Sequence, residues 1–147
     1  MSPIGHVAAS SLISAVFAFF TRSVSGTAVC FLSGIFLDVD HILDYWIAKK
    51  KVFFTYKQLE NFCGGEKAGK LYLIFHSYEF LILLWLSIVF FKANIVWLGL
   101  AVGVTAHLLL DLTANPLRPW VYSLGYRFRH GFSKYYVFPK DYYEGMK

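Results

Sequence analysis

The sequence contains few charged residues and few cysteines. Asp, Glu, Lys and Arg make up 16% of its 147 residues, whereas a soluble domain carries about 25%. Hydrophobic residues make up 57% and aromatic residues 20%, and the mean hydropathy is +0.51. This composition disfavours a soluble domain and indicates one integral membrane domain over residues 1–147. The two cysteines, Cys30 and Cys63, are too few for a disulfide framework.

The N-terminal segment lacks the basic residues that precede the apolar part of a cleavable signal peptide. It reads MSPIGHVAASSLISAVFAFF, and its first charged residue is Arg22. We therefore expect a retained first helix. Four apolar segments each approach the roughly 20 residues that cross a bilayer. The sequence predicts an all-α membrane protein with four transmembrane helices, at about 5–21, 25–47, 71–91 and 95–113, followed by a cytoplasmic tail at 114–147.

Basic residues are nearly absent from one side of this predicted topology. The loop 48–70 and the tail 114–147 lie on the same side and hold all but two of the 14 Lys and Arg residues. The two exceptions are Arg22 and Lys92. The positive-inside rule then places both termini in the cytoplasm. The net charge of +5 is explained by this topology and by attraction to anionic lipid headgroups, without a nucleic acid. We expect an amphipathic interfacial segment at 51–67.

Ionisable side chains occur inside the apolar segments, although each costs roughly 2.5–3.5 kcal/mol at mid-bilayer. All of them fall in the cytoplasmic third of the predicted spans. They are His6, Asp38, Asp40, His41, Asp44, His76, Glu79, His107 and Asp111. Neighbouring spans run in opposite directions, so their ionisable residues need not lie at the same depth in the membrane, and yet they do. This agreement in depth indicates a metal or proton site.

The spacing of these residues favours a metal. His107 and Asp111 are four residues apart and share one face of a helix, as do Asp38 and His41 at three residues. Imidazole and carboxylate ligands suit Zn best here, with Mn and Fe as alternatives. The number of ligands fits two divalent ions about 3.5–4 Å apart. The alternative is that each histidine is a hydrogen-bonded packing residue and that the acids face headgroups or neighbouring helices.

Four short motifs occur in a recognisable order: Gly5-His6, Asp38-x-Asp40-His41, His76-Ser77 and His107-x3-Asp111. Over about residues 1 to 115, this order resembles the YdjM-like inner-membrane proteins, described as predicted metal-dependent hydrolases. That family is distantly similar to the zinc-dependent phospholipase C and single-strand nuclease superfamily. The resemblance implies metal ligands at His6, Asp38 or Asp40, His76, His107 and Asp111, with His41 as a ligand or a general acid. The late His-x3-Glu pair of the soluble relatives is missing, which argues against a third metal.

The resulting functional hypothesis is a metal-dependent hydrolase that cleaves a phosphoester of a membrane lipid. We expect it in a bacterial or archaeal inner membrane, with the site facing the cytoplasm. Asp44 or Glu79 is the predicted general base. The aromatic-basic tail is either an interfacial belt or a partial lid whose arginines bind phosphate: Arg118, Arg127 and Arg129. The rival hypothesis is a metal- or proton-binding membrane protein or transporter without hydrolysis. A metalloprotease is disfavoured because His-Glu-x-x-His is missing.

Overall fold

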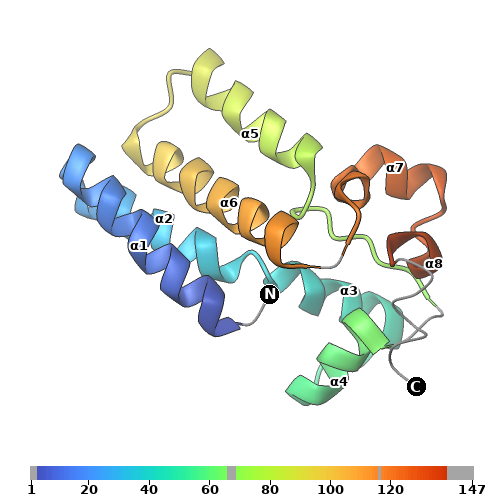
Figure 1. Ribbon diagram of the computed structural model, residues 1–147. Helices are drawn as coiled ribbons and strands as arrows, with labels where there is room; N and C mark the ends of the chain where they lie inside the picture. The colour runs from blue at the N-terminus through green and yellow to red at the C-terminus, as the bar shows by residue number, and fades with distance from the viewer. Residues whose placement is uncertain (1–2, 66–68, 116, 139–147) are drawn as a thin grey trace. The chain divides into compact units, whose positions relative to one another are not determined.

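The computed structural model describes residues 3–65, 69–115 and 117–138. Within these ranges every regular element is a helix (Figure 1), and the extended backbone forms a single antiparallel bridge between Lys70 and Ser133. The contacts divide the chain into two compact units. Unit 1 comprises Met1–Leu37 and Glu79–Asn115, and unit 2 comprises Asp38–Tyr78 and Pro116–Lys147. The all-helical fold predicted from composition is confirmed for the described residues.

Unit 1 contains four helices, and side chains cap the first turns of the second and the last of them. The helices are α1 (Pro3–Thr21), α2 (Val24–Phe36), α5 (Tyr78–Phe90, in unit 1 from Glu79 onward) and α6 (Ile95–Ala114). The Ser23 hydroxyl accepts a hydrogen bond from the Gly26 N–H at the start of α2. The Asn94 side chain accepts from the first N–H groups of α6. Such caps satisfy backbone donors that lack a partner inside the helix.

Small residues bring α2 and α6 into close contact, and α1 packs against α2 (Figure 1). A Cβ added at Gly99 of α6 would overlap the backbone carbonyl of Gly26 in α2. Further along the same pair of helices, a Cβ added at Gly103 would overlap Ser33 and Cys30. The small residues therefore allow backbones to approach as they do in membrane helix pairs. On the other side of α6, the Trp85 indole N–H in α5 donates to the Thr105 hydroxyl over 3.1 Å.

Unit 2 consists of short helices joined by irregular segments. The order is α3 (Val39–Lys49), α4 (Tyr56–Glu60), the π-helix η1 (Asn61–Gly65), the 3-10 helix η2 (Pro119–Tyr122), α7 (Leu124–Arg129) and α8 (Lys134–Val137). The buried Lys134 donates from its ammonium group to the carbonyl of Phe62 and lies 3.5 Å from the centroid of the Phe62 ring. This contact joins α8 to η1.

Three helical stretches are long and apolar enough to cross a membrane: Ile4–Thr21, Val24–Lys49 and Ile95–Ala114. The membrane character predicted from composition is thus supported, and the first and fourth predicted spans agree closely with helices. A turn at Leu37–Asp38 interrupts the second stretch, between α2 and α3. The third predicted span is wrong for residues 71–77, because α5 begins at Tyr78 and has 13 residues. Four spans with both termini in the cytoplasm stay a prediction.

The segment 71–77 is not helical because buried side chains from unit 2 hold its backbone. The Asp44 carboxylate accepts from the N–H groups of Tyr72 at 2.6 Å and Leu73 at 3.0 Å. The Asp40 carboxylate accepts from Phe75 at 2.6 Å and His76 at 3.1 Å. These bonds replace the i to i−4 ladder that a helix would need. The apolar sequence LYLIF does not reveal them, since both acids lie on α3.

Candidate metal centre

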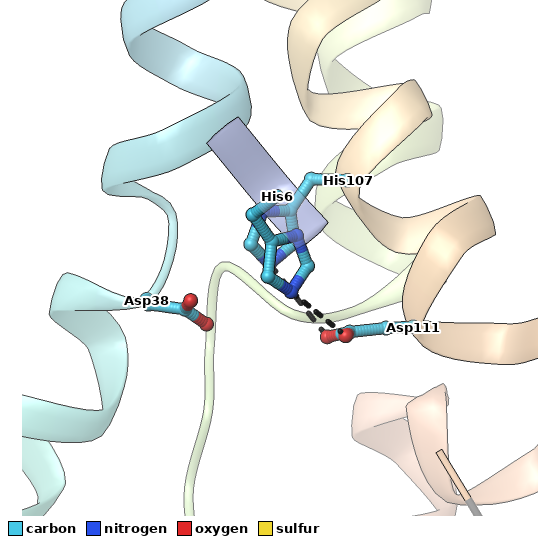
Figure 2. A group of neighbouring side chains, drawn as sticks. All are labelled: His6, Asp38, His107 and Asp111. Atoms are coloured by element: carbon cyan, nitrogen blue, oxygen red, sulfur yellow. Dashed lines mark ion pairs between the residues drawn. The ribbon is translucent and has the colours of Figure 1, made fainter. Parts of the chain in front are cut away.

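Three of the predicted metal ligands meet inside unit 1, and we call them the His107 cluster: His6, His107 and Asp111. His6 comes from the first turns of α1, and the other two stack on one face of α6. His6 Nε2 lies 3.3 Å from Asp111 Oδ1, and His107 Nε2 lies 3.6 Å from Asp111 Oδ2. Figure 2 shows both imidazole rings directed at this carboxylate. The two ring centroids are 4.0 Å apart, and the rings are nearly parallel. All three side chains are buried.

The hydrogen bond on the far side of His107 determines what its Nε2 can do. His107 Nδ1 lies 2.8 Å from the backbone carbonyl of Gly34, which can only accept a hydrogen bond. Nδ1 must therefore carry a proton, and a neutral ring then has a lone pair on Nε2. That lone pair points at the Asp111 carboxylate, which is itself an acceptor. A cation between His107 Nε2 and the Asp111 carboxylate, either a proton or a metal ion, would remove the repulsion between these two acceptors.

His6 adds a second sign of a functional site. Its side chain is 2% exposed, and its Nδ1 atom makes no hydrogen bond within the part of the chain that the structure describes. A buried polar atom without a partner is uncommon in a protein interior and calls for a specific explanation. The stacked rings and the carboxylate bring two nitrogens and at least one oxygen within 4.8 Å of one another. This set of donors could hold one metal ion.

A second group of predicted ligands meets inside unit 2, and we call it the His76 cluster: Asp38, His41 and His76. His76 Nε2 lies 3.4 Å from Asp38 Oδ1, and His41 Nε2 lies 3.7 Å from the same oxygen. The two rings are 5.0 Å apart. His76 is buried, whereas the Asp38 side chain is 41% exposed. This cluster too contains two imidazoles and one carboxylate within reach of a single ion.

Asp40 lies behind His76 and orients it. Asp40 Oδ2 is 3.4 Å from His76 Nδ1, and the same oxygen accepts from the His76 backbone N–H. A proton on Nδ1 facing Asp40 leaves Nε2 directed at Asp38, which repeats the arrangement at His107. Histidines that bind metals commonly donate their other N–H to a carbonyl or a carboxylate in this way. Asp40 was predicted as a metal ligand, but its described contacts are with the backbone and ring of the 71–77 segment.

Cys63 contacts the His76 cluster through His41, and this contact was not predicted from the sequence. Its Sγ lies 3.4 Å from His41 Nδ1, on the opposite side of the ring from Asp38. Burial raises the pKa of the Cys63 thiol to about 12, so the thiol is protonated at neutral pH. The sequence offered a weak signal at most, since Cys63 lies in a polar stretch 22 residues from His41. The Sγ contact fixes the orientation of the His41 ring.

Asp44 and Arg127, which were predicted to take part in catalysis and phosphate binding, hydrogen-bond to the backbone of segment 71–77. Asp44 Oδ2 accepts from the backbone N–H groups of Tyr72 and Leu73. Arg127 is 2% exposed, and its guanidinium donates to the carbonyls of Tyr72, Leu73 and His76. The segment 71–77 is thus held by two carboxylates at its N–H groups and by one guanidinium at its carbonyls. The general-base role of Asp44 and the phosphate-binding role of Arg127 stay predictions.

The remaining predicted residues are more accessible. Arg118 and Arg129 are exposed in unit 2, and the Arg118 guanidinium lies 5.5 Å from the centroid of the Trp120 ring. Arg129 lines an open cavity of about 920 Å³ together with Tyr126 and His130. Glu79 is half-buried in the first turn of α5. His76 was predicted to share this helix with Glu79, but it lies in the irregular segment before α5.

The fold and the two clusters define a class: a protein that is all-helical in the described residues, with three helices long and apolar enough to cross a membrane and with groups of histidine and aspartate that could bind a metal ion. Known proteins take the identification no further. No family model matches the chain, and no curated protein or solved structure matches it. The family resemblance carried by the four sequence motifs therefore stays a prediction.

Proposed function

We propose that this protein is a metal-dependent hydrolase that cleaves a phosphoester of a membrane lipid. The observation that carries the proposal is the pair of clusters, each with two imidazoles and one carboxylate. In each, one histidine has an acceptor at Nδ1 and a carboxylate facing Nε2. Such sets suit Zn, with Mn and Fe as alternatives. One divalent ion in each cluster would match the number of ions expected from the sequence.

The residues of this chain would divide the work as follows. When bound, the ions would lower the pKa of a bound water and neutralise charge on the phosphoryl oxygens. Asp44 or Glu79 is the proposed general base. Arg118 and Arg129 are proposed to attract and orient the phosphate, since an exposed guanidinium can bind it through two N–H groups. His41 would serve as a ligand or as a general acid.

The proposal of a lipid substrate is supported by the three helices of this chain that are long and apolar enough to cross a membrane. Substrate headgroups would approach from the leaflet that the basic loop and tail face. The proposed location is a bacterial or archaeal inner membrane, with the site on the cytoplasmic side, in keeping with the distribution of Lys and Arg. This location rests on the sequence pattern alone.

A non-catalytic proton- or metal-binding membrane protein or transporter is the second candidate. One observation favours it: a proton between His107 Nε2 and Asp111 would satisfy both groups without any metal. Intramembrane histidine and aspartate pairs serve as proton relays in transporters. Metal content and turnover separate the two candidates.

The test begins with the metal content of protein purified in detergent without added metal and after incubation with Zn. The substitution His107→Ala should remove metal from its cluster and abolish turnover, whereas His130→Ala, which changes the histidine outside both clusters, should not. Turnover would be sought with phospholipids, lysolipids and isoprenoid phosphates. A folded wild type that binds no metal contradicts the hydrolase proposal. Bound metal without turnover on any of these lipids favours the second candidate.

A further inference from the structure

One surface of unit 2 presents several large apolar side chains to the outside. Phe53 is 92% exposed, more than any other large apolar side chain in the described residues, and Val52 is 66% exposed. Trp46, Ile47 and Tyr56 are also exposed. We call these five residues, together with the exposed lysines beside them, the Phe53 surface. The lysines are Lys49, Lys50, Lys51 and Lys57.

The backbone beneath this surface is held in place, so the exposure of Phe53 is a built feature of the fold. The Trp46 indole N–H donates to the Val52 carbonyl over 3.3 Å. The next residue, Phe54, turns inward and packs on the buried Tyr45 with ring centroids 4.8 Å apart. Thr55 and Gln58 then form a capping box that starts α4. Phe53 is therefore presented outward between two anchored neighbours.

The position of the surface in the chain indicates its partner. The candidate span Val24–Lys49 ends where the lysine run begins. Since an extended chain covers at most about 3.6 Å per residue, Phe53 lies within roughly 14 Å of the end of that span. A membrane span ends at the headgroup layer, so the Phe53 surface is within reach of that layer. Exposed lysines beside exposed aromatic side chains are the pattern of an interfacial anchor.

We propose that the Phe53 surface docks on the anionic headgroups of the bilayer in which the protein resides. Val52 and Phe53 enter the boundary between headgroups and acyl chains, and the lysines contact the lipid phosphates. Each lysine near an anionic surface strengthens such binding roughly fivefold. This inference is independent of the hydrolase proposal, because it uses no residue of either metal cluster and no catalytic step.

The experiment measures backbone hydrogen–deuterium exchange of the full chain in nanodiscs. One set contains phosphatidylcholine alone, and the other an equimolar mixture of phosphatidylcholine and phosphatidylglycerol. Peptides covering residues 49–60 should exchange more than an order of magnitude more slowly in the anionic discs, because the roughly fivefold effects of the individual lysines multiply. The double substitution Val52→Ser/Phe53→Ser should remove this protection. The quadruple substitution Lys49→Gln/Lys50→Gln/Lys51→Gln/Lys57→Gln should make exchange equal in the two lipids.

A matched control is available in unit 1. Phe90 and Phe91 are also exposed aromatic residues, but they precede the single basic residue Lys92. The double substitution Phe90→Ser/Phe91→Ser should leave the lipid dependence of residues 49–60 intact. Equal exchange of wild-type protein in both disc types overturns the proposal. Protection that depends on protein concentration in discs of either composition also overturns it, because it would identify a protein partner or a second copy instead.

Discussion

Arg127 Nη2 donates a 3.0 Å hydrogen bond to the backbone carbonyl of His76, 51 residues earlier in the chain. The same guanidinium donates to the carbonyls of Tyr72 and Leu73. Asp40 and Asp44 hold the N–H groups of this segment from the other side. His76 therefore owes its position to three buried ionic side chains and not to a helix. The first two predictions concern this arrangement.

The substitution Arg127→Met should unfold the segment 71–77. Three carbonyls, two of them in buried hydrogen bonds, would lose their donor, and each unsatisfied buried group costs about 1–3 kcal/mol. We expect the free energy of unfolding to fall by roughly 3 kcal/mol or more. Thermal unfolding in detergent measures this. Arg129→Met, an exposed arginine on the same helix, is the control and should change the midpoint little. Equal midpoints for Arg127→Met and wild type would contradict the structural role of Arg127.

Substitutions at Asp44 should separate a structural role from a general-base role. Asp44→Ala removes the acceptor for two buried N–H groups, and hydrogen bonds to charged groups are worth about 1.5–3 kcal/mol each. Asp44→Asn keeps one side-chain oxygen as an acceptor and should destabilise less. Thermal midpoints of both variants would be compared with that of wild type. If Asp44→Asn kept the wild-type midpoint and lost all turnover, while Glu79→Gln stayed active, Asp44 would be the base.

Metal removal should destabilise the protein if the clusters hold ions. A ligand present at 100 times its dissociation constant stabilises the folded state by about 2.7 kcal/mol. A chelator should therefore lower the unfolding midpoint, and added Zn should restore it. His76→Ala and His107→Ala should each remove part of this response, while His130→Ala should retain all of it. A midpoint indifferent to chelator and Zn would count against bound metal.

Cys63 should react slowly with alkylating reagents in the folded protein. Burial raises the pKa of its thiol from 9.0 to about 12, and the nearby Lys134 charge lowers it only in part. The thiolate is the reactive form and is scarce at neutral pH. Above pH 9.0 an unfolded chain releases this proton and the folded chain retains it, so stability should fall as pH rises from 9.0 towards 12. This alkaline loss should be smaller in Cys63→Ser. Rapid labelling of folded protein by iodoacetamide, measured by mass spectrometry, would contradict the raised pKa.

The substitution Gly99→Ala should disrupt unit 1. Its methyl group would overlap the Gly26 carbonyl, so α2 and α6 would have to separate. Overpacking of this kind costs typically 1–3 kcal/mol. Gly34→Ala is the comparison, because its methyl group meets the side chain of Ser10, which can rotate more easily than a backbone can shift. The thermal midpoint should fall further for Gly99→Ala. The reverse order would show that α2 and α6 do not pack as described.

Much of unit 1 could be predicted from sequence because its signals are local. The helix α6 (Ile95–Ala114) agrees with the predicted span 95–113, and the i, i+4 spacing of His107 and Asp111 places them on one face. The segment 71–77 could not be predicted, because its apolar residues are typical of a helix. Its actual partners, Asp40, Asp44 and Arg127, are separated from it by dozens of residues.

The roles of individual site residues were the least predictable part. The sequence analysis grouped Asp40 with the ligands because of its motif and its depth in the predicted span, and Arg127 with the phosphate-binding residues because it lies in the aromatic-basic tail. The structure shows that both side chains form hydrogen bonds with the backbone of His76, Asp40 at its N–H group and Arg127 at its carbonyl. Hydrogen bonds from a side chain to a distant backbone group leave no periodic pattern in a sequence.

The long separation between His76 and Arg127 has a consequence for biosynthesis. A nascent chain emerges with its N-terminus first, so α1, α2 and α6 can pack while the tail is still being translated. The carbonyls of segment 71–77 receive their donor after residue 127 of 147 has been made. Contacts of this sequence separation also form slowly. His76 is therefore held in place last, and a chain truncated before Arg127 would keep the His107 cluster and lack an ordered His76.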